Sequence, residues 1–345
     1  MHAAAAKIPG IASLDGDAIW RDVIGSGRPA VLRGLVCAWP SVAVSRRSPV
    51  ALAEYLRSFD NGSPVDAIMT APEAEGRVFY DDAMNGFNFI RNRLPVSAIA
   101  EQILRYSAFA RPPAVAVQSA LLRDCLPGFA AQNPLSVLEG VEPRIWLGNA
   151  ITTPAHVDEW NNIGCVVSGR RRFTLFPPEQ IANLYIGPLD FAPTGAPMSL
   201  VKLHDPDFTR LPRFRQALAA ALSAELEPGD ALYIPPLWWH HVESLEPFNM
   251  LVNYWWHASP LRHASPARPL GTAPGFDSLI HAILTLRQQP AATREAWRAL
   301  FNHYVFGDEA DVVGHIPPHR HGILGNVSDA DIARLRASLA ERLSK

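Results

Sequence analysis

Residues 111–257 consist of short apolar or alternating runs, and this pattern limits the possible folds more than any other feature of the chain. Pro, Gly and Asn separate the runs and favour turns between them. The runs lie at residues 114–122, 144–150, 162–169, 171–178, 230–236 and 249–256. Many short strands with turn signals between them are typical of an all-β barrel or sandwich. We therefore predict a mainly β core over residues 111–257.

The segment before this core, residues 1–110, mixes helical and strand patterns. In residues 48–59, Ser48 is placed to cap a helix and Pro49 suits its first position, while the apolar residues fall on one stripe. Residues 28–35 have the pattern of a strand that follows a proline and ends at Gly34. We predict that these residues form an α/β flank of the core.

The segment after the core, residues 258–345, begins with a Pro-rich connector at 259–275 and continues with helical periodicity. Apolar residues recur at helical spacing from Phe276 and again from Trp297, and Ser328 precedes the last such stretch in the manner of an N-cap. We predict a C-terminal helical segment that packs on the core or forms part of a subunit interface.

Composition narrows the class of protein. Of the 345 residues, 48% are hydrophobic and 19% are charged, and the net charge is −2. These values suit a globular protein with a large core and give no sign of a nucleic-acid-binding surface. Cys37, Cys125 and Cys165 lie far apart, and the chain shows neither a convincing signal peptide nor an apolar stretch of about 18 residues. We expect a cytoplasmic protein that binds neither nucleic acid nor a membrane.

His156 and Asp158 are two positions apart in residues 153–162, TPAHVDEWNN. On a strand, both side chains would point to the same face and could bind one metal ion. The pair is a weak signal by itself and needs a third ligand elsewhere. Residues 227–244, EPGDALYIPPLWWHHVES, supply His240 after a turn, an apolar strand and a second bend. Two histidines and one carboxylate leave coordination positions open, as in non-haem Fe(II) oxygenases.

His241 is the alternative third ligand, because His241 and Glu243 themselves form a His-x-Glu pair. On a strand, both would lie on the face opposite His240, where Glu243 could hydrogen-bond His241.

The same segments resemble the JmjC-type, cupin-fold 2-oxoglutarate oxygenases, most closely the cupin-like group that contains the asparaginyl hydroxylase factor inhibiting HIF. The matching stretches are TPAHVDEWNN, GRRRFTLFPPEQ, PGDALYIPPLWWHHVESL and NMLVNYWW. Weaker matches at 28–40 and 79–89 extend the resemblance over most of residues 28–256. The resemblance implies a double-stranded β-helix (jelly-roll or cupin) core. It also implies an Fe(II) site made by His156, Asp158 and His240, with the register after tryptophan favouring His240 over His241.

The resemblance further implies 2-oxoglutarate and O₂ as co-substrates. The cation for the distal carboxylate of 2-oxoglutarate falls on Arg171, where factor inhibiting HIF carries lysine, and arginine can hold a carboxylate bidentately. Strand alternation places Arg171 on the face of apolar neighbours, although a solvated arginine cluster at a strand start is the alternative. Thr153, Asn162 and Asn253 match other positions around the co-substrate.

The substrate pocket is less well defined by the resemblance. A tyrosine of the family enzyme is missing here, with Ala116 nearest in register. Our candidates for the pocket are Gln118, Trp160, Trp239 and Trp255, and the tryptophans could equally be core residues.

The implied reaction hydroxylates a protein, peptide or amino-acid-like substrate and converts 2-oxoglutarate and O₂ into succinate and CO₂; demethylation is the other outcome known for this fold. The C-terminal helices resemble, in position and amphipathic spacing, those that form dimers in factor inhibiting HIF, and the resemblance therefore implies a homodimer. Two other classes stay open: a Zn or Mn isomerase or hydrolase that uses the same ligands, and a non-catalytic ligand-binding cupin.

His315, His319 and His321 could bind a metal, but prolines among them favour a loop packed on the last helix. Cys165 lies in an apolar segment and is expected in the core.

Overall fold

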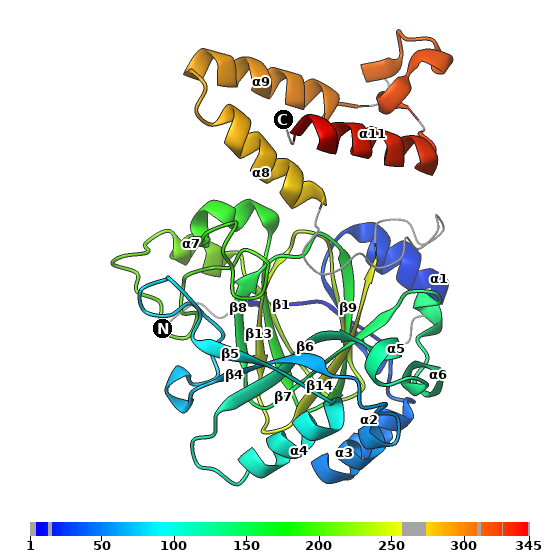
Figure 1. The fold of residues 1–345 in the computed structure, drawn as a ribbon, viewed down its shortest axis with the longest axis vertical. Coiled ribbons are helices and arrows are strands. Elements are labelled where there is room, and N and C mark those ends of the chain that lie inside the picture. Colours follow the sequence, from blue (N-terminus) through cyan, green and yellow to red (C-terminus); the bar gives the residue numbers. More distant parts are fainter. Residues whose placement is uncertain (1–4, 13–15, 257–273, 309–311, 326, 344–345) are drawn as a thin grey trace. The chain divides into compact units, whose positions relative to one another are not determined.

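The computed structural model describes residues 5–12, 16–256, 274–308, 312–325 and 327–343 (Figure 1). The chain divides into two compact units, Met1–Thr272 and Ala273–Lys345. The predicted boundary at residues 257/258 and most of the predicted Pro-rich connector lie in residues 257–273, outside the described residues.

Two β-sheets form the centre of the first unit. The strands of the nine-stranded sheet are, in spatial order, β2 (Gly10–Ala12), β3 (Ala30–Arg33), β12 (Ala231–Ile234), β9 (Asn161–Ser168), β14 (Asn249–Trp256), β7 (Pro143–Gly148), β6 (Ala114–Leu121), β4 (Val65–Thr70) and β5 (Phe89–Leu94). Those of the five-stranded sheet are β1 (Ala6–Lys7), β11 (Leu222–Leu226), β10 (Arg171–Phe176), β13 (Trp239–Ser244) and β8 (Thr152–His156). Each strand predicted within 111–257 is present, with ends shifted by a few residues.

The order of the last eight strands gives the double-stranded β-helix predicted for the core. From β7 to β14 the chain crosses between the two sheets, so that β7, β9, β12 and β14 join the larger sheet and β8, β10, β11 and β13 join the smaller. Apart from the parallel pairs β1–β11 and β2–β3, the pairs of strands within each sheet are antiparallel. The described strands form two facing sheets and do not close into one hydrogen-bonded barrel. The sandwich alternative of the prediction is therefore the better description.

Apolar side chains fill the space between the sheets. Val166, Leu232 and Leu251 of the larger sheet pack in one cluster with Phe173 and Leu175 of the smaller sheet. Because alternate residues of a strand face opposite sides, this cluster identifies the interior-facing residues of β9, β10, β12, β13 and β14. His240 and Arg171 have the same strand parity as interior residues on β13 and β10, and this positions the candidate site.

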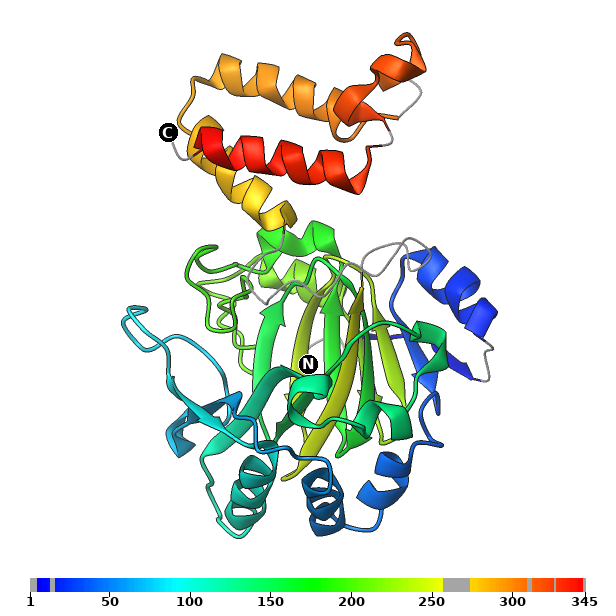
Figure 2. The same cartoon turned by 45° about the vertical axis from the view of Figure 1, so that its right-hand side comes forward.

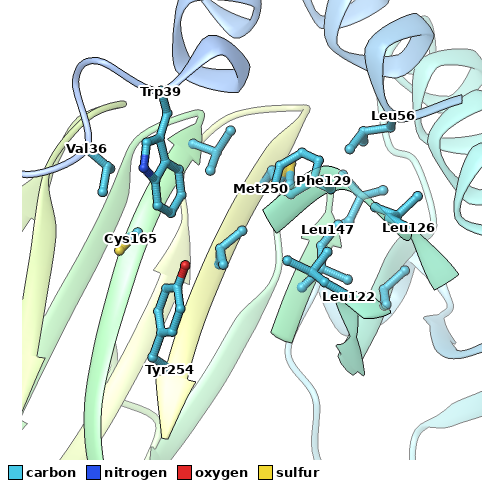
Figure 3. Close-up of a cluster of buried hydrophobic side chains, with 14 of the residues drawn as sticks. Val36, Trp39, Leu56, Leu122, Leu126, Phe129, Leu147, Cys165, Met250 and Tyr254 are labelled. Carbon is cyan, nitrogen blue, oxygen red and sulfur yellow. The ribbon is translucent and has the colours of Figure 1, made fainter. Parts of the chain in front are cut away.

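A larger apolar core covers the opposite face of the nine-stranded sheet. Its helices are α2 (Pro40–Ser45), α3 (Pro49–Arg57), α4 (Val96–Tyr106), α5 (Leu122–Cys125) and α6 (Phe129–Gln132), and α2, α3 and α4 lie together in both ribbon views (Figures 1 and 2). In Figure 3, Leu56 and Phe129 lie on the helical side, and Leu147, Cys165 and Met250 lie on strands. Cys165 is fully buried there, which confirms its assignment to the core.

Local sequence signals explain how the flanking elements begin and end. Ser48 caps α3 as predicted, since its Oγ accepts a hydrogen bond from the amide of Ala51 at 3.0 Å. β3 is shorter than predicted but is followed at once by Gly34, whose φ of 69° suits glycine. The short helices α1 (Gly16–Ala18) and α7 (Phe214–Ala219) complete the α-helices described in this unit.

The second unit is helical, as predicted for the C-terminal segment. Its long helices are α8 (Pro274–Leu286), α9 (Ala291–Tyr304) and α11 (Asp329–Leu343). Ser328 precedes α11 and its Oγ accepts a hydrogen bond from the amide of Asp331 at 3.2 Å, which confirms the predicted cap. Among the described helices of the whole chain, none has the length and apolar character that crossing a membrane requires.

Candidate metal centre

His156 and Asp158 lie at the end of β8, where the strand turns toward β9. The prediction that both occupy one strand face is wrong in this detail, because β8 ends at His156 and Asp158 belongs to the following connection. The connection is held in place by a hydrogen bond in which the amide of Leu237 donates to the carbonyl oxygen of Asp158 at 2.8 Å. The ligand atoms of His156 and Asp158 nevertheless lie within 4.8 Å of each other, because the connection after β8 keeps Asp158 beside the end of the strand.

His240 faces His156 across the β8–β13 pair. The two residues are direct partners in the register, and their ring centroids are 4.1 Å apart. Each Nδ1 lies at hydrogen-bond distance from a backbone carbonyl oxygen two residues earlier, 2.9 Å for His156 to Pro154 and 3.0 Å for His240 to Trp238. A proton on each Nδ1 leaves each Nε2 with a lone pair for a metal ion.

The ligand atoms of His156, Asp158 and His240 all lie within 4.8 Å of one another. His240 Nε2 is 3.5 Å from Asp158 Oδ2, a buried carboxylate oxygen with no hydrogen-bond partner. Burial lowers the pKa of His240 to about 4, with the neighbouring His156 as a second cause, so the imidazole is neutral at pH 7. A neutral imidazole nitrogen beside an unpartnered carboxylate oxygen fits a divalent cation, and the set matches that of Fe(II) oxygenases.

Arg171 begins β10 and is only 6% exposed. Its Nε has no hydrogen-bond partner, and burial lowers its pKa to about 10, so the guanidinium still carries its charge at neutral pH. The neighbouring Arg170 and Arg172 behave differently, because both lie partly in solvent and pair with Glu225. The predicted alternation is confirmed, and a solvated cluster does not describe Arg171. A buried guanidinium whose Nε lacks an acceptor favours an anionic ligand.

Asn162 and Asn253 lie on neighbouring strands of the larger sheet and contact each other. Asn253 Nδ2 is 3.4 Å from Asn162 Oδ1, and Trp146 on β7 donates from Nε1 to Asn253 Oδ1 at 2.9 Å. Our sequence analysis missed Trp146. The signal available was strand alternation in residues 144–150, which separates Trp146 from Ile145 and Leu147 of the helix-covered core.

Some of the other predicted site residues lie on the interior side of the sheets, and others do not. Thr153 is half-buried opposite Val242, on the interior side of the β8–β13 pair. Gln118 is half-buried on β6, Trp160 is half-buried between β8 and β9, and the buried Nε1 of Trp255 has no hydrogen-bond partner. Trp239 pairs with Phe176 and, by alternation, faces away from His240. Ala116, the position of the missing tyrosine, is buried in a small apolar cluster.

His241 and Glu243 occupy the face of β13 opposite His240, as the alternation predicts. The expected hydrogen bond between them is absent, since His241 Nε2 is 3.9 Å from Glu243 Oε2. Glu243 Oε1 instead lies 2.9 Å from His204 Nε2.

The predicted C-terminal histidines lie elsewhere. No metal-ligating group among the described residues includes His315, His319 or His321. His319 and His321 line a hollow beside Leu335 of α11, as expected for a loop next to that helix.

Comparison with known proteins gives the family. The model of the cupin-like domain matches residues 17–262, more than half of the chain. The chain belongs to the cupin-like domain family. This agrees with the resemblance to JmjC-type oxygenases that the motifs carry.

Three curated relatives illustrate the range of the family. The chain is 35% identical to human HSPB1-associated protein 1 over 130 residues, 37% of this chain and 25% of that protein. It is 34% identical to the Arabidopsis thaliana lysine-specific demethylase JMJ31 over 117 residues, 34% of this chain and 21% of that protein. The human bifunctional peptidase and (3S)-lysyl hydroxylase JMJD7 is 28% identical over 268 residues, 69% of this chain and 79% of its own length. The chain thus matches about a quarter of the first relatives but most of JMJD7.

Proposed function

We propose that this chain is an Fe(II)- and 2-oxoglutarate-dependent oxygenase that hydroxylates a protein, peptide or amino-acid-like substrate. The observation that carries the proposal is Arg171, a buried cation without an acceptor for its Nε, on the interior side of the same small sheet that holds His240. A Zn or Mn isomerase or hydrolase with the same ligands would have no use for such a cation. A non-catalytic cupin would need neither Arg171 nor the three ligands.

Each residue of the site has a defined task in this reaction. Fe(II) would be held through Nε2 of His156 and His240 and through the carboxylate of Asp158. When bound, iron supplies the oxidising chemistry by which one atom of O₂ enters the substrate C–H bond and the other enters succinate as CO₂ leaves. Arg171 would bind the distal carboxylate of 2-oxoglutarate, with the Thr153 hydroxyl as a second donor.

The remaining polar residues would orient the co-substrate. Trp146 fixes the amide of Asn253, which in turn contacts Asn162, and this chain of side chains would hold the metal-chelating end of 2-oxoglutarate in one pose. We keep Gln118, Trp160 and Trp255 as candidates for the substrate pocket and leave Trp239 out of it, because it faces away from His240. JMJD7, named as a bifunctional peptidase and lysyl hydroxylase, matches 69% of this chain, whereas the demethylase JMJ31 matches 34%, and this favours hydroxylation over demethylation as the outcome.

A binding measurement without oxygen tests this function directly. Metal-free protein is mixed with Fe(II) and 2-oxoglutarate, and the visible charge-transfer band of a chelated keto acid is recorded. We expect the band in the parent protein, its loss in His156→Ala and its weakening in Arg171→Ala. Arg170→Ala is the matched control, since Arg170 is half exposed, pairs with Glu225 and Glu246 on the other face of β10, and should leave the band unchanged. Tight Zn or Mn binding without a band would favour the isomerase or hydrolase class instead.

Two further predictions belong to this proposal. The three cysteines are free thiols, which supports a reducing compartment such as the cytoplasm. We also propose that the protein is a homodimer joined through its C-terminal helices, whose apolar residues are partly exposed.

A further inference from the structure

A second cluster of metal-ligating side chains lies on the other face of the five-stranded sheet. Alternation along β13 sends His240 to the interior and His241 and Glu243 to the opposite face. His204 reaches the same place from the loop between β10 and α7. One ligand atom from each of His204, His241 and Glu243 lies within 4.8 Å of the other two.

The distances within this cluster are close to those of a coordinated ion. His204 Nε2 is 2.9 Å from Glu243 Oε1, and His241 Nε2 is 3.9 Å from Glu243 Oε2. Tetrahedral bonds of about 2.1 Å place neighbouring ligand atoms about 3.4 Å apart. The contact of His204 with Glu243 Oε1 would open by about half an ångström and that of His241 with Glu243 Oε2 would close by about as much, with the two oxygens of the carboxylate sharing the ion.

His241 provides a second, independent observation. Its side chain is 5% exposed, and its buried Nε2 has no hydrogen-bond partner. Buried polar groups are almost always paired, so an unpartnered nitrogen aimed at a carboxylate and another imidazole indicates a ligand position.

Two arginines, Arg172 and Arg77, place positive charge near the cluster of His204, His241 and Glu243. Arg172 Nη1 lies 3.5 Å from Glu243 Oε1 and competes with a cation for that oxygen. The same guanidinium is partly exposed and also contacts Glu225 Oε2 at 3.4 Å, so it can keep Glu225 and release Glu243. Arg77 also acts on His241 electrostatically, but it lies over the ring of Phe79 and donates to the carbonyl oxygen of Leu200.

We propose that His204, His241 and Glu243 form a second binding site, for a divalent transition metal of the Zn²⁺ class. Two imidazoles and one carboxylate suit Zn²⁺ and Co²⁺, whereas Mg²⁺ and Ca²⁺ prefer oxygen ligands. A bound ion links the loop that carries His204 to β13, and it thereby braces the strand that holds His240 on its other face. This site does not depend on the proposed function of the interior site.

The test uses Co²⁺ as the probe and the intact chain with His156→Ala and Asp158→Ala, which remove two ligands of the interior site and leave β13 unchanged. We expect one equivalent of Co²⁺ by equilibrium dialysis, with the strong visible absorption of a four-coordinate ion. Adding His204→Ala should weaken Co²⁺ binding at least about 100-fold. Adding Arg172→Gln should strengthen it about 10-fold, because a competing positive charge is removed.

Matched controls isolate the cluster. His281→Ala removes an exposed histidine elsewhere, and Arg105→Gln removes an exposed arginine on α4; both should leave the affinity for Co²⁺ within about twofold of the background protein. Absence of Co²⁺ binding, or binding that His204→Ala does not change, would overturn the proposal. If circular dichroism shows that the background protein is unfolded, the number of Co²⁺ ions bound per chain is measured instead in the protein that keeps His156 and Asp158. Two equivalents that fall to one in His204→Ala support the site, and an unchanged number overturns it.

Discussion

Arg171 has opposite effects on the stability of the free protein and on ligand binding. Its charge is buried and its Nε has no acceptor, a state that costs free energy until an anion arrives. We predict that Arg171→Met raises the free energy of unfolding of the ligand-free protein by about 1–2 kcal/mol. The same change should weaken 2-oxoglutarate binding by about 10- to 150-fold, the loss of a charged hydrogen-bonded contact of ~1.5–3 kcal/mol. Urea unfolding and ligand titration measure the two effects, and a destabilised free protein would contradict the assignment.

His240 and His241 make the stability of the metal-free protein depend on pH. Burial lowers the pKa of His240 to about 4 and that of His241 to about 3, from an ordinary value of 6.5. Between about pH 6.5 and pH 4 the unfolded chain therefore binds more protons than the folded protein, and the free energy of unfolding falls as the pH falls. Each histidine contributes up to ~1.4 kcal/mol per pH unit in this window.

The measurement is urea unfolding of chelator-treated protein at pH 7 and pH 5. We expect a clear loss of stability at pH 5, and a smaller loss in His241→Asn, in which one of the two buried imidazoles is gone. The exposed His281→Asn variant should behave as the parent does. Equal stability of the parent at both pH values would rule out the buried neutral state of these side chains.

For individual residues of the candidate metal centre, the sequence predicted those that share a strand face or a motif. His156, Asp158 and His240 were identified from spacing and resemblance, and Arg171 from alternation with Phe173 and Leu175. The structure does bring the first three together, while their binding of Fe(II) stays a prediction. His204 was not predictable, because it lies in a loop and reaches Glu243 only through the folding of residues far apart in the chain.

Among the elements, the turn between β12 and β13 carries the backbone strain nearest to the candidate metal centre. Leu237 has a φ of 64°, a conformation that disfavours branched side chains, and its amide holds the carbonyl of Asp158. We predict that Leu237→Asn raises the free energy of unfolding by about 0.5–1 kcal/mol, since asparagine tolerates this conformation, and that Leu237→Ile lowers it by about 1 kcal/mol. Urea unfolding of the two variants tests this, and equal stability of Ile and Leu at this position would show that no strain is present.

Sequence periodicity predicts the strands that are buried along their whole length and therefore carry an apolar run. Both faces of β9 and β14 are almost entirely buried, and their apolar runs were assigned as strands. β11 and β5 were not assigned, because β11 is half-buried and mixes polar with apolar residues, and β5 is largely exposed and carries two arginines. Such strands form because a neighbouring strand offers hydrogen bonds, and their own sequence gives little sign of it.

For the whole molecule, the exposed apolar residues on the C-terminal helices are the feature from which we propose a homodimer. Leu335, Leu339 and Leu343 recur every four residues on α11 and are each close to half exposed. Trp297 and Tyr304 on α9 are similarly exposed. Exposed apolar residues that recur on one side of a helix form an apolar stripe, which is typical of an interface, and a second copy of the same helices is the partner that the family resemblance implies.

Light scattering after size exclusion tests the proposed homodimer. We expect a dimer for the parent protein and a monomer for the double variant Leu335→Glu and Leu339→Glu, which places charge in the stripe. Arg336→Glu changes charge at an exposed position between them and should leave the dimer intact. A monomeric parent protein would show that the apolar stripe does not bind a second copy.

The nine-stranded sheet ends at β5, and β5 hydrogen-bonds a neighbouring described strand only on its β4 side. An edge of this kind is a template for aggregation, because its unpaired amides and carbonyls can accept a strand from another molecule. Arg91 and Arg93 are exposed on that strand; Arg93 pairs with Asp66 on β4 at 3.4 Å, while Arg91 donates to the carbonyl oxygen of Pro193, so we expect the positive charge of Arg91 in particular to oppose the approach of a second such edge. Charged residues at such a position keep an edge strand from recruiting other chains, and an engineered variant that replaced both arginines with valine would expose a β-prone, uncharged edge to every other copy in a concentrated solution.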